Sequence, residues 1–145
     1  MKYTDWLIPQ LRDYEARKQF LADAPERLRE LEDRSTAIRA AKTDSIPVHG
    51  DISPYEDAII ANIAEREKIA ANIKMVSEDI ARLDAALDQL TAQERLVIQR
   101  FYIHRTSDYI ERLSDELCLE RSQVYRVKDH AVIHLARILF GIVEL

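Results

Sequence analysis

The chain has 145 residues, of which 47% are apolar and 32% are charged, and its formal net charge is −5. With only 2 glycines and 4 prolines it lacks the turn-forming residues of a β-sandwich or barrel, and it has no glycine-rich phosphate loop. Its single cysteine excludes an intramolecular disulfide framework, and no apolar stretch approaches the roughly 20 residues that span a bilayer. We therefore expect an all-α protein of the cytoplasm, with charge too near its beginning for a secretory signal and no membrane contact.

The first part of the chain carries apolar residues at helical spacing, which predicts a long helix. These residues, three, four or seven positions apart, are Leu7, Leu11, Tyr14, Leu21, Leu28, Leu31 and Ile38. From Asp23 to Glu26 an aspartate, a proline and a glutamate have the pattern of a helix start, so we expect a break or kink near residues 23–25. We expect Trp6 and Tyr14 to pack inside the protein, with a contact to another subunit as the alternative.

A loop and a second long helix are predicted next. Residues 43–54 lose the periodicity and include two prolines and a glycine, so the loop ends where Pro54 opens the next helix. The apolar stripe of that helix has near-heptad spacing and comprises Ile59, Ile63, Arg66, Ala70, Ile73, Val76, Ile80, Leu83, Leu87 and Leu90. Such a stripe is typical of coiled-coil packing against the first helix or against another subunit. We expect residues 1–90 to form a helical hairpin that joins copies into a homo-oligomer, because two helices leave apolar surface unburied.

A second domain of short helices is predicted over residues 91–145. Thr91–Glu94 is a capping box that marks the start of a new helix. Further helices are predicted over Tyr109–Leu117 and, after the tight connection Cys118–Glu120, over the residues that follow. The side chains expected to face the interior are Leu96, Val97, Phe101, Ile110, Leu113, Leu117, Val124, Val127, Ala131 and Leu135. Two short helices joined by about three residues, the second with basic and amide side chains, form the helix-turn-helix pattern.

Two segments of this domain, LTAQERLVIQRFYI and IERLSDELCLERSQVYRVKDHAVIHL, resemble region 4 of bacterial sigma factors. The matching features are Leu90–Thr91 with Glu94–Arg95, the run Leu113–Leu117, and Arg121–Val124 with Lys128, Ala131 and Leu135. The layout of the whole chain, with a long helical first half and a loop around IPVHGD, resembles phage and prophage regulators of the ArpU/RinA type. This resemblance implies a transcription regulator of late viral genes that binds double-stranded DNA in the bacterial host cytoplasm and contacts RNA polymerase.

The sequence departs from the sigma-like pattern at three positions. Cys118 stands where the turn usually has glycine, and a non-glycine residue with positive φ costs on the order of 1 kcal/mol. Glu120 precedes the last helix where serine or threonine is a common cap, and it adds an acid near the expected phosphates. Ser114 replaces a small apolar residue. None of these departures removes the predicted fold.

The last helix is predicted to present a DNA-reading face. Helical spacing places Ser122, Gln123, Arg126 and His130 on the outer face of this helix. The residues that flank this face are Arg121, Tyr125 and Lys128. Arginine pairs bidentately with guanine and glutamine with adenine, whereas hydroxyl groups and lysine hold phosphates. The alternative interpretation is an ordinary solvated helix face, because a single basic face is common.

Other chemistry is only weakly indicated. His130 and His134 have the four-residue spacing of metal ligands, but no further ligand completes a site, so we expect neither metal nor cofactor. We expect Cys118 to be a small core residue and the carboxylates to lie on solvated helix faces, so no enzymatic activity is predicted. Two alternative functions remain: a DNA-packaging recognition subunit similar to small terminase subunits, and an adaptor that docks on RNA polymerase without DNA specificity of its own.

Overall fold

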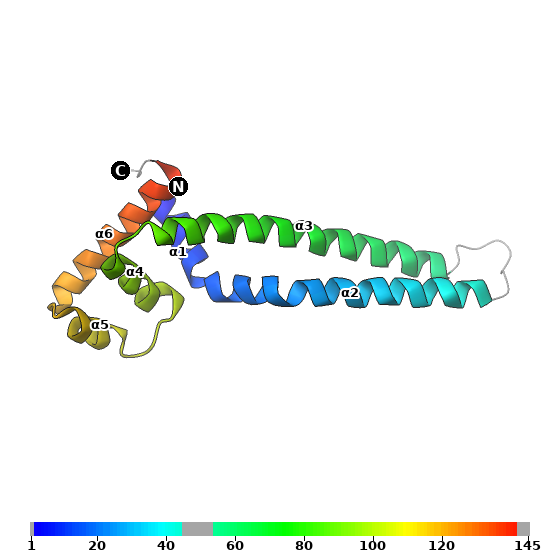
Figure 1. Ribbon diagram of the computed structural model, residues 1–145, viewed down its shortest axis with the longest axis horizontal. Coiled ribbons are helices and arrows are strands. Elements are labelled where there is room, and N and C mark those ends of the chain that lie inside the picture. Colours follow the sequence, from blue (N-terminus) through cyan, green and yellow to red (C-terminus); the bar gives the residue numbers. More distant parts are fainter. Residues whose placement is uncertain (1, 45–53, 142–145) are drawn as a thin grey trace. The chain divides into compact units, whose positions relative to one another are not determined.

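The computed structural model describes residues 2–44 and 54–141 (Figure 1). In chain order its helices are α1 (Tyr3–Arg12), α2 (Tyr14–Asp44), α3 (Pro54–Asp88), α4 (Ala92–Ile98), the π-helix η1 (Gln99–Ile103), α5 (Tyr109–Leu117) and α6 (Arg121–Phe140). No strand occurs in the described ranges, so the all-α prediction is confirmed. Most of the loop predicted over residues 43–54 lies outside the described residues. In the part of the chain that is described, no helix is long and apolar enough to cross a membrane.

The chain forms two compact units, and their division falls within α2 and α3. The terminal unit comprises Met1–Lys18 and Asp79–Leu145, and the hairpin unit comprises Gln19–Glu78. In the terminal unit, Leu7 and Leu11 of α1 and Leu83 and Leu87 of α3 are all buried. The domain boundary that the sequence predicts at residue 90 stays a prediction.

The break expected near residues 23–25 is absent, and the first interruption of the helix lies at Asp13. α2 continues through Pro25, and the buried side chain of Ala24 holds this turn in place by packing. At Asp13 the chain changes direction between α1 and α2 (Figure 1). The Asp13 N–H still donates to the carbonyl oxygen of Pro9 at 3.0 Å, and its own carbonyl accepts from the Arg17 N–H at 2.9 Å. The change of direction therefore leaves these backbone hydrogen bonds intact.

In the hairpin unit α2 and α3 lie side by side and antiparallel, and a buried amide fixes their register (Figure 1). Asn62 is 6% exposed, and its Nδ2 donates to the carbonyl oxygen of Leu31 at 2.8 Å. Arg27 pairs with Glu65 at 2.8 Å one turn away. A buried polar side chain of this kind specifies register, since any slip would leave it unpaired.

The core of the terminal unit lies beneath α5 and the start of α6. It is built from Val97, Phe101, Ile110, Leu113 and Val124, surrounded by Leu96, Tyr102, Tyr109, Leu117, Leu119 and Val127. The inward-facing residues predicted for these helices are thus confirmed as buried or half-buried. At the far end of α6, Phe140 stacks on Tyr3 with ring centroids 4.6 Å apart and meets Trp6 edge-on at 5.4 Å, so Trp6 packs inside this unit as expected.

The connection between α5 and α6 is a left-handed helix ending. Cys118 has φ 54° and ψ 43°; its N–H donates to Asp115 at 3.4 Å, and the Leu119 N–H donates to Ser114 at 3.1 Å. These two bonds form the Schellman arrangement, which satisfies carbonyl groups at the helix end. The Ser114 hydroxyl also donates to the Leu119 carbonyl oxygen, which gives this departure from the sigma-like pattern a role in the turn.

The prediction that Cys118 is a core residue is wrong, because its side chain is exposed. A residue in the left-handed conformation that ends a helix directs its Cβ away from the packed face, and the Cys118 Sγ lies 3.7 Å from the Asp115 carbonyl oxygen. The cysteine therefore carries the conformational strain of the turn without the benefit of burial.

Changing Cys118 to glycine should stabilise the protein, since glycine adopts positive φ without steric cost. We expect Cys118→Gly to raise the free energy of unfolding by about 0.5–1 kcal/mol, the relief of strain less the extra entropy of glycine. Cys118→Val should lower it, because a β-branched side chain is poorly tolerated there. Chemical denaturation monitored by circular dichroism measures both, and equal stability of the two variants would contradict the argument.

Candidate nucleic-acid interface

Burial of one side of α6 determines which side faces solvent. Val124, Ala131 and Leu135 are all 0% exposed, so the helix cannot rotate without exposing apolar surface. The opposite side carries Ser122, Arg126 and His130, each exposed and each four residues from the next. Residues at this spacing form a continuous ridge along a helix. We call these three residues the α6 ridge.

The side chains of the α6 ridge are available to a partner. Among the described residues, Ser122, Arg126 and His130 make no hydrogen bond or ion pair through their side chains. Arg126 is the central member, and its guanidinium group offers five N–H donors. A helix with such a ridge on a rigid core can enter the major groove of DNA and present donors to base edges.

Two other predicted site residues, Arg121 and Gln123, are engaged within the protein. Arg121 bonds through its guanidinium group to the carboxylate of Glu111 on α5, and both side chains are more than half exposed. Gln123 Oε1 accepts the backbone N–H of Glu120 at 3.1 Å, so the glutamine caps the start of α6. Arg121 must leave the carboxylate of Glu111 before it can bind a DNA phosphate. Gln123, in contrast, keeps its amide N–H donors free.

Tyr125 and Lys128 lie beside the ridge against the aromatic ring of Phe101. The Tyr125 ring meets Phe101 edge-on at 5.7 Å, and the Lys128 Nζ lies 5.6 Å from the centre of the Phe101 ring. Lys128 also bonds to Asp129 at 2.6 Å; although its partial burial opposes ionisation, the hydrogen bond to Asp129 outweighs that effect and raises the pKa of the lysine. The charge of Lys128 thus already has a partner in Asp129, and the expected contact of this lysine with a phosphate stays a prediction.

One candidate phosphate contact, Arg105, is absent from the sequence prediction. Arg105 is exposed just before α5, its guanidinium lies 4.3 Å from the centre of the Tyr109 ring, and its Nη2 donates to the Tyr109 hydroxyl at 2.7 Å. The nearby Arg112 differs, since it bonds to the carboxylate of Asp108 at 2.8 Å. Arg105 thus retains its full charge in a fixed position. The dipeptide His104–Arg105 before a predicted helix start was the available signal.

A half-buried contact joins α6 to α4. The His134 Nδ1 lies 2.8 Å from one carboxylate oxygen of Glu94, and the other oxygen accepts the Thr91 N–H in the predicted capping box. Burial alone would raise the pKa of Glu94, but the hydrogen bonds from Thr91 and His134 outweigh it and hold that pKa below its ordinary value. His134 is therefore a structural residue that anchors α6, while His130 stays on the exposed ridge. No group of potential metal ligands occurs among the described residues.

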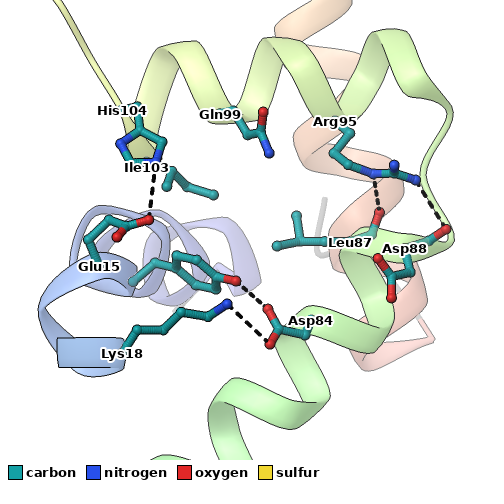
Figure 2. A pocket seen from close by; sticks show the side chains of 10 residues that line it. Glu15, Lys18, Asp84, Leu87, Asp88, Arg95, Gln99, Ile103 and His104 are labelled. Carbon is teal, nitrogen blue, oxygen red and sulfur yellow. Dashed lines mark hydrogen bonds and ion pairs between the residues drawn. The ribbon is translucent and has the colours of Figure 1, made fainter. Parts of the chain in front are cut away.

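The terminal unit also contains an open pocket of about 460 Å³, drawn in Figure 2. Its lining residues are Tyr14, Glu15, Lys18, Asp84, Leu87, Asp88, Arg95, Gln99, Ile103 and His104. The Tyr14 hydroxyl and the Lys18 ammonium both bind the carboxylate of Asp84, and Glu15 bonds to His104 at 3.1 Å. Burial and the bond to Asp84 raise the pKa of Tyr14, so the phenol stays protonated.

The polar groups of this pocket mainly hold the protein together. Arg95 donates from Nε to the carbonyl oxygen of Leu87 at 3.2 Å and from Nη2 to those of Asp88 and Leu90 at 3.3 and 3.2 Å. These bonds satisfy the carbonyl groups of Asp88 and Leu90 after the last turn of α3, and they add a second donor to the Leu87 carbonyl oxygen, which also accepts the Leu90 N–H at 3.2 Å. With its charges paired and its arginine used as a helix cap, the pocket offers weaker support for a function than the α6 ridge.

Comparisons with protein-family models, curated proteins and solved structures find no match for this chain. Function is therefore inferred from the geometry of α6 together with the sequence resemblance.

Replacing Glu94 should remove part of the pH dependence of stability. A carboxyl group whose pKa is lowered by folding stabilises the protein above its ordinary pKa of 4.5, and this contribution is lost as pH falls through the folded value. We expect Glu94→Gln to cost about 1 kcal/mol at pH 7, because the amide keeps the cap on Thr91 but loses the charge-assisted hydrogen bond to His134, and we expect the deficit to shrink on acidification towards pH 3. Urea denaturation from pH 7 to pH 3 measures this. Asp33→Asn on α2 is the control, and a deficit for Glu94→Gln that does not change with pH would contradict the assignment.

Proposed function

We propose that this protein is a sequence-specific DNA-binding regulator of transcription that reads DNA with α6. The observation that carries the proposal is the α6 ridge, an exposed row of Ser122, Arg126 and His130 on a helix fixed by a buried opposite side. Specific reading needs donors and acceptors held in a defined register, because each correct bidentate pair adds about 1–3 kcal/mol of discrimination.

Roles for the surrounding residues follow from their contacts. Arg126, unpaired among the described residues, is the candidate for guanine, and the free amide donors of Gln123 suit a neighbouring acceptor. Arg121 and Arg105 are candidates for phosphates, since one sits at the start of α6 and the other before α5. In this proposal Lys128 and Tyr125 support the reading face through Phe101 and touch the DNA backbone only at its edge.

The distribution of charge is compatible with DNA binding. Residues 1–90 contain 13 basic and 18 acidic residues and so account for the whole net charge of −5, whereas residues 91–145 contain 8 of each. A domain with no net charge can still bind DNA through a local cationic surface. The resemblance to sigma region 4 and to ArpU/RinA-type regulators supports control of late viral genes, with RNA polymerase as a second partner.

Replacing Arg126 with alanine should weaken binding to the preferred sequence by about 1–3 kcal/mol, or about 5- to 150-fold, and relax preference at one base pair. The preferred duplex is first selected from a randomised library with the full chain, and fluorescence anisotropy then gives the affinities. Arg34→Ala, at an exposed arginine of α2, is the matched control. Unchanged affinity and preference in a folded Arg126→Ala variant would rule out α6 as the reader.

Arg121 should act on all sequences alike, because a phosphate contact carries no base information. We expect Arg121→Ala to weaken binding to preferred and random duplexes equally. We also expect the slope of log affinity against log salt concentration to become less steep by about one, because one phosphate contact is lost. Glu111→Gln should have the opposite effect, a few-fold gain in affinity, since it releases Arg121 from its carboxylate partner. Titrations from 50 to 300 mM salt test both, and an unchanged slope for Arg121→Ala would remove it from the interface.

The adaptor that docks on RNA polymerase is the second candidate, favoured by the acidic residues around the turn. Asp115 and Glu120 are exposed beside the start of α6, where they would oppose phosphates and suit a basic protein surface, whereas the nearby Glu116 is paired with Arg100 at 3.0 Å. The same assays with and without bacterial RNA polymerase separate the two functions. An adaptor would bind the selected duplex only in the presence of polymerase, whereas the proposed regulator binds it alone.

A further inference from the structure

The outer face of α3 exposes two large apolar side chains. The exposed large hydrophobic residues of the described chain are Ile60, Met75 and Tyr125, and the first two are 64% and 58% exposed on α3. Their positions belong to the hairpin unit. Isolated exposed apolar residues are ordinary, and these two lie about 22 Å apart along the helix, so the residues between them decide whether they belong to one surface.

The residues between Ile60 and Met75 complete a single stripe. This outer stripe consists of Ile60, Ala64, Glu67, Lys68, Ala71 and Met75, and every member is exposed. At about 100° per residue, these positions fall within a band about 100° wide. Asn62, which bonds to α2, lies on the opposite side of the helix. The outer stripe therefore lies away from the buried surface that forms the hairpin, and only its Glu67 also borders a shallow groove beside Leu28 and Glu32 of α2.

We propose that a second copy of this chain docks on the outer stripe with its α3 antiparallel to the first. A two-fold axis between Glu67 and Lys68 would pair each residue with the residue of the partner copy whose number, added to its own, gives 135. Ile60 then faces Met75 of the partner, Ala64 faces Ala71, and Glu67 faces Lys68. Each pair occurs twice, as a two-fold interface requires.

The chemistry of the outer stripe suits this partner. Alanines seven residues apart let two helix backbones approach closely at the centre, and the larger Ile60 and Met75 fill the space further out. The central Glu67 and Lys68 give two ion pairs in the antiparallel arrangement, whereas a parallel one would place like charges together. Asp57 and Glu78 would face each other only at the solvated ends, where repulsion is weak. This self-complementary order of charges favours a second copy over an unrelated partner.

The first test is the oligomeric state of the full chain, measured by sedimentation velocity from about 1 to 100 μM. We expect a dimer, and we expect Ile60→Asp to weaken dimerisation at least about tenfold, because it places a carboxylate in the apolar part of the interface. Asp33→Lys, at an exposed position of α2, is the control and should leave the dimer unchanged. A monomer at all concentrations, or a dimer equally stable with Ile60→Asp, would overturn the proposal.

Charge reversal tests the antiparallel pairing directly and keeps the apolar residues intact. Glu67→Lys turns both central ion pairs into lysine pairs, so the dissociation constant should rise about tenfold. The double variant Glu67→Lys/Lys68→Glu recreates both pairs and should restore dimerisation. In a parallel dimer Glu67 would face Glu67 of the partner copy, so the single variant would replace a pair of glutamates by a pair of lysines and have little effect. Failure of the double variant to restore dimerisation would also contradict the pairing, provided that circular dichroism shows the helices intact.

A distance measurement separates the two orientations independently of stability. Spin labels on Glu78→Cys, in a Cys118→Ser background, should lie about 32 Å apart along the helix axis in the antiparallel dimer, given a rise of 1.5 Å per residue over the 21 residues from Asp57 to Glu78. A parallel dimer would bring them to about 10 Å. The short distance would overturn the proposal. All three measurements are made without DNA, so their outcome is independent of the proposed regulatory function.

Discussion

The burial of one side of α6 is the constraint on which the terminal unit depends. Val124, Ala131 and Leu135 are completely covered, and helices α1, α4 and α5 all pack on α6. Rotation of α6 by even one position would expose these side chains and separate His134 from Glu94. The helix therefore has a single orientation, and the face opposite the core is as rigid as the core itself. A ridge for base recognition needs this rigidity because bidentate hydrogen bonds tolerate little displacement.

Much of the fold follows from local patterns in the sequence. The bounds of α5, the capping box at Thr91 and the inward-facing residues of the last helices were predictable because each rests on helical spacing or on a residue a few positions away. The interruption at Asp13 and the continuation through Pro25 were not, since they depend on packing between segments distant in the sequence.

The sequence also predicts only part of the candidate site, because it does not show which side chains are in contact. Spacing alone placed Ser122, Gln123, Arg126 and His130 on the outer face of the last helix, and all four are exposed. It could not show that Arg121 is held by Glu111, because that contact joins two helices across the turn, nor that Arg105 rests on an aromatic ring. A count of charges along the helix thus overstates the positive potential that a ligand would meet, since some cations are already neutralised by neighbours.

The wide turn η1 determines how the number of residues in this segment can change. The His104 N–H donates to the Gln99 carbonyl oxygen at 2.7 Å, five residues earlier, so this turn holds one residue more than an α-helical turn. A turn of this kind is an α-helix with one residue inserted, so loss of a single residue here would let the segment close as an ordinary α-helical turn and would leave the helix on either side in register. Loss of a residue from α4, which has no such surplus, would instead rotate the buried Phe101 by about 100° relative to the capping box at Thr91. The wide turn thus gives this segment a residue that it can lose while both flanking stretches of helix keep their faces.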